Sequence, residues 1–226
     1  RRLGEICRKA ARRIYEGETE KIRVSGNNLE EFLGKPKYRE DKKNKKDEIG
    51  IVRGLAWTSV GGVTLEIEVN VLPGKGELVL TGKLGDVMKE SARAGISYIR
   101  SISSDYGIDP EFFTKHDIHV HIPEGAVPKD GPSAGITMAL AILSAITERP
   151  VRADIAMTGE ITIRGRVLPI GGLKEKLLAA KNAGMKTVCI PKDNERDLSE
   201  LSEEITEGME ILPIDHMNQL IKAAFV

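Results

Sequence analysis

The sequence has few of the features that mark secreted or nucleic-acid-binding proteins. Cysteine occurs only twice among 226 residues, at Cys7 and Cys189, far apart and in different kinds of segment. This spacing predicts two free thiols in a reducing compartment rather than a disulfide. Thirty-four Lys and Arg residues balance thirty-four Asp and Glu residues, so the formal net charge is zero. No long-range field therefore favours nucleic acid or a membrane surface as a partner.

No hydrophobic run is long enough to cross a bilayer. The longest apolar stretch, residues 134–146, is interrupted by Thr137 and Ser144. It falls short of the roughly 20 residues that a spanning helix needs. The sequence does not open with a basic, apolar leader that ends in small residues. We therefore expect a soluble, cytoplasmic protein without a membrane partner.

The sequence also lacks a phosphate-binding loop. In GELVLTGKL, five residues separate Gly76 from Gly82, where such a loop has four, and Leu84 takes the place of the Ser or Thr that would hold magnesium. No Gly-x-Gly-x-x-Gly follows a strand pattern and opens a helix. We expect this chain to bind no nucleotide and no other cofactor.

Histidine is scarce, with four residues in the chain. His119 and His121 alternate along one predicted strand, and this spacing can place two metal ligands on one face. No third ligand is evident, which favours two polar members of a half-exposed strand over a zinc site. The spacing of the histidines does not select any of them for a Ser–His–Asp triad.

The residues that are present divide the chain into three parts. Residues 1–35 contain an amphipathic helix pattern, LGEICRKAARRIYEG, and a second short helix that ends at Gly34. Residues 36–48 are highly charged and almost free of apolar side chains, which predicts a solvated linker. Two short helices bury little surface by themselves. The first part is therefore expected to be the end of a larger domain.

Residues 49–226 mix strand and helix patterns, which predicts an α+β (mixed α/β) domain with several short sheets and packed helices. VTLEIEVNV alternates apolar and polar residues and predicts a half-buried strand. PGKGE turns the chain into LVLTG, and the two strands are expected to form a hairpin. Helices are expected near residues 86–100, 133–147 and 173–183 and at the C-terminus, with short strands at DIHVHI, 155–157, 161–163, 167–168, TVCIP and MEILPI.

The segment PKDGPSAG contains a serine at the expected start of a helix. Pro132 suits the first helical turn, and the glycines on either side of Ser133 allow close approach of another backbone or a substrate. The amides of Ser133 and Ala134 lack intrahelical partners and point along the positive end of the helix dipole, where they would stabilise an oxyanion. From the local sequence, helix capping explains Ser133 as well as nucleophilic catalysis does.

One lysine lies on an unexpected face of the helix predicted within LPIGGLKEKLLAAKNAG. At about 100° per residue, Lys174 and Lys181 fall on a polar arc, whereas Lys176 falls beside Ala179 and Ala180. Burying an ammonium group is unfavourable and lowers its pKa, which would make Lys176 a neutral base near pH 7. The alternative is that its side chain extends past these small neighbours to solvent.

Together, Ser133 and Lys176 predict a Ser–Lys dyad, in which the lysine activates the serine without an imidazole. Thr158, in MTGEI at the end of a predicted strand, has a hydroxyl that can accept a hydrogen bond from the lysine. Asp130 and Glu160 could pair with positive charge, although an exposed position in a turn is the commoner explanation for such residues.

Three segments resemble the proteolytic domain of the bacterial Lon family of ATP-dependent serine proteases: GLAWTSVGG, PKDGPSAG and MTGEITIRGRVLPIGGLKEK. The resemblance extends over essentially all of residues 49–226. It implies that Ser133 is the nucleophile, Lys176 the general base and Thr158 a hydroxyl beside the lysine. Three further positions match residues around the family's site, with less defined roles: His121, Asp130 and Glu160.

The resemblance also implies that residues 1–35 are a remnant of the small helical domain of an AAA+ module. The full-length protein would bind ATP and magnesium through the missing part of that module, form a homohexameric ring and act on unfolded polypeptides. DNA binding, known for some members, finds no support in this neutral chain. Two other functions stay open: a non-catalytic ring-assembly or binding module, and a small-molecule esterase or amidase that uses the same dyad.

Overall fold

The computed structural model describes residues 1–35, 44–58, 61–123 and 125–226, and the chain divides into two compact units, Arg1–Glu40 and Asp41–Val226. Most of the predicted linker, namely residues 36–43, lies outside the described residues. The boundaries predicted at residues 35 and 49 remain predictions.

The first unit consists of α1 (Arg2–Tyr15), a 3-10 turn (Gly26–Asn28) and α2 (Leu29–Leu33). It has one buried side chain among its helical residues, Phe32, and the Lys9 Nζ donates a hydrogen bond to the Phe32 carbonyl at 2.6 Å. Leu3 and Ile14, part of the apolar stripe of α1, are exposed. This unit therefore has very little core of its own.

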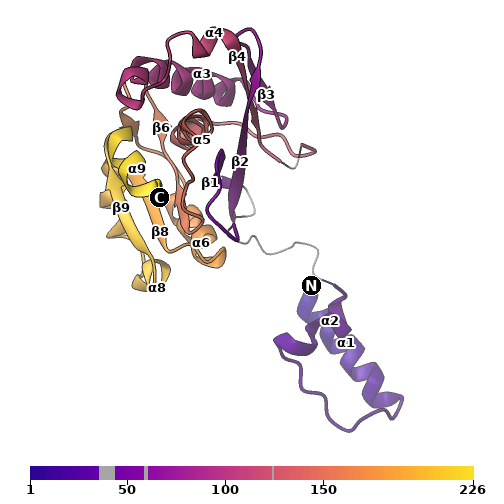
Figure 1. Ribbon diagram of the computed structural model, residues 1–226. Coiled ribbons are helices and arrows are strands. Elements are labelled where there is room, and N and C mark those ends of the chain that lie inside the picture. The colour runs from indigo at the N-terminus through magenta and orange to yellow at the C-terminus, as the bar shows by residue number, and fades with distance from the viewer. Residues whose placement is uncertain (36–43, 59–60, 124) are drawn as a thin grey trace. The chain divides into compact units, whose positions relative to one another are not determined.

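The second unit contains a seven-stranded sheet in the order β3-β4-β2-β1-β5-β8-β9 (Figure 1). Its strands are β1 (Ile51–Thr58), β2 (Gly61–Pro73), β3 (Leu78–Thr81), β4 (His116–His121), β5 (Ile155–Met157), β8 (Thr187–Pro191) and β9 (Glu210–Ile214). A second sheet pairs β6 (Glu160–Ile161) with β7 (Val167–Leu168). The predicted α+β class is confirmed, with one large and one small sheet.

The helices of the second unit include four with at least eight residues: α3 (Asp86–Ser101), α5 (Gly135–Thr147), α6 (Leu173–Asn182) and α9 (Met217–Ala224). The shorter helices are α4 (Phe112–Lys115), α7 (Glu195–Leu198) and α8 (Glu203–Thr206). The 3-10 turns are η2 (Ser103–Tyr106), η3 (Pro132–Ala134) and η4 (Lys192–Asn194). Across the described residues, no helix has both the length and the apolar character needed to cross a membrane.

The predicted hairpin between β2 and β3 is wrong. β2 pairs with β1 on one side and β4 on the other, both antiparallel, while β3 lies beyond β4 and runs parallel to it. The turn before β3 is held by Asp117 at the start of β4, whose Oδ1 accepts hydrogen bonds from the amides of Lys75 and Glu77, each at 2.8 Å. The chain therefore crosses to the far side of β4 instead of folding back on β2.

Side chains alternate between the two faces of the sheet and build two cores. On one face, Val52 and Met157 pack with α3, α5 and α9. On the other face, Leu55 and Ala156 pack with α6. In Figure 1, α5 and α6 accordingly lie on opposite sides of β1.

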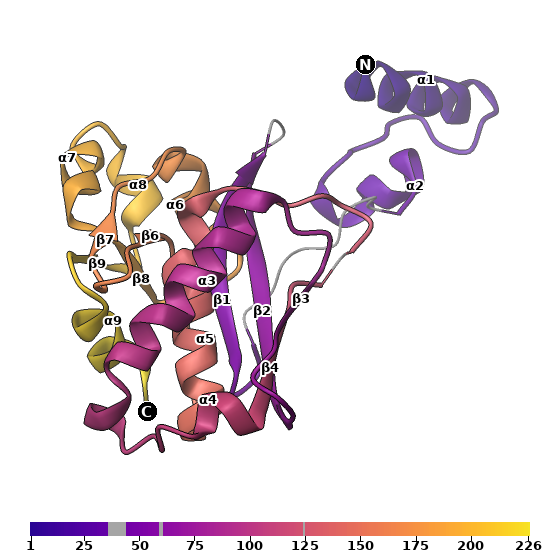
Figure 2. The same ribbon diagram turned by 90° about the horizontal axis from the view of Figure 1, so that it is seen from above.

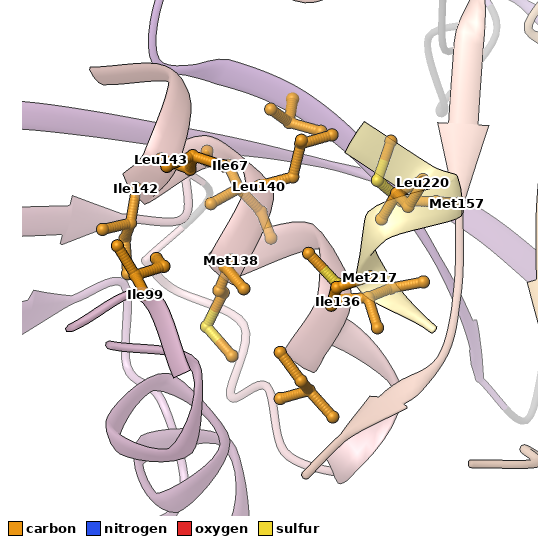
Figure 3. Close-up of a cluster of buried hydrophobic side chains, with 14 of the residues drawn as sticks. Ile67, Ile99, Ile136, Met138, Leu140, Ile142, Leu143, Met157, Met217 and Leu220 are labelled. Carbon is orange, nitrogen blue, oxygen red and sulfur yellow. The ribbon is translucent and has the colours of Figure 1, made fainter. Parts of the chain in front are cut away.

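Helix α5 is the central element of the larger core. Its first ten residues, from Gly135 to Ser144, are all buried, and α3 packs alongside it (Figure 2). Figure 3 shows its side chains Ile136, Met138, Leu140, Ile142 and Leu143 among those of the neighbouring elements. The α-helix begins at Gly135 and not at Ser133, because the preceding residues form the 3-10 turn η3.

Two glycines let α5 and α6 lie directly against the central strands. A Cβ at Gly54 of β1 would lie 3.1 Å from the Thr137 hydroxyl of α5. A Cβ at Gly62 of β2 would lie only 1.9 Å from the carbonyl oxygen of Glu175, so the backbone of α6 occupies the space of a side chain. This contact between α6 and β2 contributes to the position of Lys176, the next residue.

We predict that Thr137→Val stabilises the protein. The Thr137 Oγ1 is buried and has no hydrogen-bond partner among the described residues. The Ser133 carbonyl, its usual acceptor four residues earlier, already receives the Gly159 amide at 2.8 Å and the Thr158 hydroxyl at 3.3 Å. Removing this unpaired hydroxyl should raise the free energy of unfolding by about 1 kcal/mol in urea titrations.

Thr147→Val is the matched control on the same helix. The Thr147 hydroxyl donates to the Leu143 carbonyl at 2.7 Å, so this substitution loses a hydrogen bond and should not stabilise. A Thr137→Val protein no more stable than its parent would contradict the prediction.

Candidate active site

The candidate site lies where the parallel strands of the sheet end. β1, β5 and β8 run parallel, and the crevice beyond the carboxyl ends of such strands is where α/β proteins commonly bind ligands. Thr158 follows the last residue of β5, Ser133 lies just before α5 on one face, and Lys176 lies near the start of α6 on the other. Three residues distant in sequence thus approach the same edge.

Lys176 is buried in this edge, with 1% of its surface exposed, whereas Lys174 on the same helix is exposed. The only hydrogen bond that the described residues give its Nζ goes to the Thr158 Oγ1, at 3.0 Å. Desolvation by burial lowers the pKa of Lys176 to about 8. A substantial fraction of this lysine is therefore the neutral amine at slightly alkaline pH.

Thr158 links the lysine to the serine segment. Its side chain is fully buried, and its hydroxyl donates to the Ser133 carbonyl at 3.3 Å while accepting from Lys176. Its amide donates to the Cys189 carbonyl of β8 at 3.1 Å. No direct hydrogen bond joins the Ser133 Oγ to the Lys176 Nζ within the described part of the chain, so Thr158 is the group that connects them.

The turn that carries Ser133 is fastened to the segment after β5. The Ser133 carbonyl accepts the Gly159 amide at 2.8 Å, and the Gly159 carbonyl accepts the Ile136 amide at 3.2 Å. A Cβ at Gly135 would lie 3.0 Å from the Ile161 amide nitrogen, which explains the glycine after the serine motif. The half-buried Ser133 thus lies at the positive end of the α5 dipole.

Asp130 contacts α3 rather than the lysine. Its Oδ1 accepts hydrogen bonds from the Met88 amide at 3.0 Å and the Gly131 amide at 2.8 Å. Met88 lies in the first turn of α3, whose own N-cap residue, Gly85, has no room for a side chain because its Cβ would lie 2.2 Å from the Asp130 Cγ. Asp130 therefore caps α3 and ties the loop before Ser133 to it.

The other two expected residues also form no hydrogen bond with Lys176 among the described residues. The His121 Nδ1 and the His119 Nε2 each lie 2.8 Å from the Thr81 Oγ1, and two strands separate β4 from β5. Glu160 is half-buried on β6, where it pairs with Leu168 of β7, and its side chain forms no hydrogen bond or ion pair with another described residue. Among the residues that the structure describes, no cluster of three His, Cys, Asp or Glu side chains could hold a metal ion.

Nothing in the sequence indicated that Cys189 contributes to the candidate site. Its carbonyl fixes the backbone of Thr158, whereas its thiol is buried, which raises the thiol pKa to about 12. A backbone contact between neighbouring strands leaves no signature in the side chain, so no sequence pattern could have revealed this role.

We predict that Lys176→Met raises stability. With a pKa of about 8 instead of 10.5, the lysine takes up its proton less readily in the folded chain than in the unfolded chain. At pH 7 this difference opposes folding by about 3 kcal/mol, and Met removes it while keeping most of the apolar stem. Chemical denaturation should show the gain, and Lys174→Met on the exposed side should show almost none.

The contribution of Lys176 to the free energy of unfolding changes with pH in a definite direction. Between about pH 8 and 10.5, the unfolded chain binds more protons at Lys176 than the folded chain does, so this group makes the parent more stable as the pH rises. The advantage of Lys176→Met should therefore shrink over this window. An advantage that is absent at pH 7, or that grows toward pH 10, would contradict the burial argument.

Comparison with known proteins agrees with the resemblance in the sequence. Residues 23–226 match the family described as Lon protease (S16) C-terminal proteolytic domain. The Lon proteases of Clostridioides difficile and Lachnoclostridium phytofermentans are 60% and 55% identical to the chain, and Lon protease 1 of Bacillus subtilis is 54% identical.

Each of these alignments covers 100% of this chain but only 29%, 33% and 29% of the respective relative. The chain therefore spans about a third or less of the length of these relatives. The family match reaches the C-terminal residue and includes the whole candidate site. The chain belongs to the Lon protease (S16) family and contains its C-terminal proteolytic domain.

Proposed function

We propose that this chain is the endopeptidase part of an ATP-dependent protease and cleaves peptide bonds of unfolded polypeptides with a Ser133–Lys176 dyad. The observation that carries the proposal is the buried Lys176, whose Nζ bonds only Thr158 among the described residues, while the Thr158 hydroxyl reaches the Ser133 backbone. General-base catalysis requires a base whose pKa lies near the working pH and a nucleophile that substrate can reach. Lys176, with its lowered pKa, and the half-buried Ser133 meet these two requirements.

In this mechanism the neutral Lys176 accepts the proton of the Ser133 hydroxyl as the oxygen attacks the peptide carbonyl. The Ser133 and Ala134 amides, at the N-terminal end of α5, stabilise the oxyanion. Lys176 then protonates the leaving amine, and water hydrolyses the acyl-enzyme. The hydrogen bond between the nucleophile and the base commonly tightens only when substrate is bound, which fits their link through Thr158 here.

The remaining expected residues act further from the reacting atoms. We assign Asp130 to holding the loop before Ser133 through α3. Glu160, beside the serine turn, is placed to influence the charge near the site, and His121 supports β3 and β4 through Thr81.

The whole protein would add functions that this chain lacks. We assign residues 1–35 to the end of the small helical domain of an AAA+ module, whose missing part would bind ATP and magnesium. The relatives are about three times as long as this chain, which leaves room for such a module. We further propose that the full-length protein is cytoplasmic and forms a homohexameric ring, with no membrane or nucleic acid as a partner.

We predict that Ser133→Ala lowers the hydrolysis of a fluorogenic peptide by about 1,000-fold or more, because the nucleophile is lost. The far-ultraviolet circular dichroism spectrum should be unchanged, since Ser133 is not part of the fully buried core. Ser97→Ala, an exposed serine on α3, is the control and should keep full activity.

The outcomes separate the alternatives. Full peptide hydrolysis by Ser133→Ala would contradict the mechanism. A parent chain that hydrolyses small esters but neither peptides nor casein would indicate an esterase. A parent chain that does not react with a fluorophosphonate at Ser133 would indicate a binding module.

A further prediction concerns pH. The rate at which a fluorophosphonate labels Ser133 should rise with pH, with a midpoint near the Lys176 pKa of about 8, because only the neutral amine accepts the serine proton. Lys176→Arg should label at the background rate throughout, since a guanidinium keeps its proton, while Lys174→Arg should follow the parent curve. A flat parent profile between pH 6 and about 10 would contradict lysine as the base.

A further inference from the structure

The segment that leads into α6 is held by one buried amide side chain. Asn194, 4% exposed, lies in the 3-10 turn η4 directly after β8. Its Oδ1 accepts the Ile170 amide at 2.9 Å, and its Nδ2 donates to the Ile170 carbonyl at 3.0 Å. The side chain thus pairs with both backbone groups of a single residue, as a neighbouring strand would.

Ile170 lies just before the turn that starts α6. Gly171 and Gly172 follow, and the Lys176 amide donates to the Gly172 carbonyl at 3.1 Å, so the first bonded turn of the helix begins at this glycine. Gly172 has φ +69°, and a Cβ there would lie 2.6 Å from the Trp57 ring. The start of α6 therefore packs against Trp57 and follows, two residues later, the backbone that Asn194 holds.

The same segment also supports the acceptor of the lysine. The Cys189 carbonyl of β8 accepts the Thr158 amide at 3.1 Å, and Asn194 follows five residues later in the sequence. β8 and the turn after it therefore hold both partners of the hydrogen bond from Lys176 to Thr158. A small displacement of Ile170 would move the lysine relative to a hydroxyl that stays fixed.

We propose that Asn194 is a positioning residue for the general base. It acts through Ile170 and the first turn of α6 to keep the Lys176 Nζ aligned with the Thr158 hydroxyl and shielded from water. The proposal rests on the proposed function, since it assumes that Lys176 is the base. Among the described residues, the side chain of Asn194 bonds to Ile170 and Asp197 and not to Ser133, Thr158 or Lys176, so its effect is indirect.

A simpler role is to stabilise α7. Asn194 is the N-cap residue of this helix, and its Nδ2 also donates to the Asp197 Oδ2 at 2.6 Å. This contact uses the second amide hydrogen, whereas the contacts with Ile170 use the first hydrogen and the oxygen. Asp197→Ala therefore removes the contact within α7 and leaves both hydrogen bonds to Ile170 in place, which makes it the matched control.

The test compares Asn194→Ala, Asp197→Ala and the parent chain. The rate of fluorophosphonate labelling at Ser133 is measured from pH 6 to about 10, together with thermal unfolding. In Asn194→Ala we expect labelling at pH 7.5 to fall by about tenfold or more, because a displaced base loses alignment. The midpoint of the pH profile of labelling in this variant should move to higher pH, because water that reaches the Lys176 Nζ restores the ordinary lysine pKa. Asp197→Ala should keep the parent midpoint.

The possible outcomes distinguish failure of the positioning role of Asn194 from failure of the proposed function. A folded Asn194→Ala chain with the parent rate and midpoint would overturn the positioning role, and so would an equal shift in Asp197→Ala. If Asn194→Ala does not fold, Asn194→Ser, which leaves a smaller cavity and a hydroxyl, is measured in its place and read in the same way. A parent chain that does not label at Ser133 would instead overturn the proposed function.

Discussion

The site depends on the hydrogen bond from the Lys176 Nζ to the Thr158 Oγ1, two groups that are both buried at the edge of the sheet. A buried ammonium would need a charged partner, and a neutral hydroxyl cannot replace one. Burial therefore makes the ammonium less favourable than it is in water, which lowers the pKa of Lys176 to about 8. The close contact of α6 with Gly62 and the fixed end of β5 hold the two groups together.

Local periodicity predicted the parts of the site that lie within one element. The helical wheel placed Lys176 on the apolar side, and the structure buries it. The end of the MTGEI strand placed Thr158 at an edge, where it meets the lysine. Two distant segments could be connected only because each contains a residue type that is unusual in its setting: a lysine among alanines and a serine between glycines.

The parts that the sequence did not predict depend on contacts between distant segments. Alternation in VTLEIEVNV predicts a strand but not its neighbours, and Asp117, some forty residues from the turn, directs β3 to the far side of β4. The sequence left Asp130 either in an exposed turn or paired with positive charge, yet it caps α3, whose N-cap residue Gly85 has no side chain. No local pattern contains this information.

Ser133, just before α5, and Lys176, on α6, belong to opposite faces of one sheet, each with a core of its own. Neither half-packed form can bring them together, since α5 without α6, or α6 without α5, leaves one partner displaced. If the proposed dyad is correct, the site is therefore complete only when both cores are packed. A partly folded chain with one core unpacked would then have no complete dyad with which to cut other proteins.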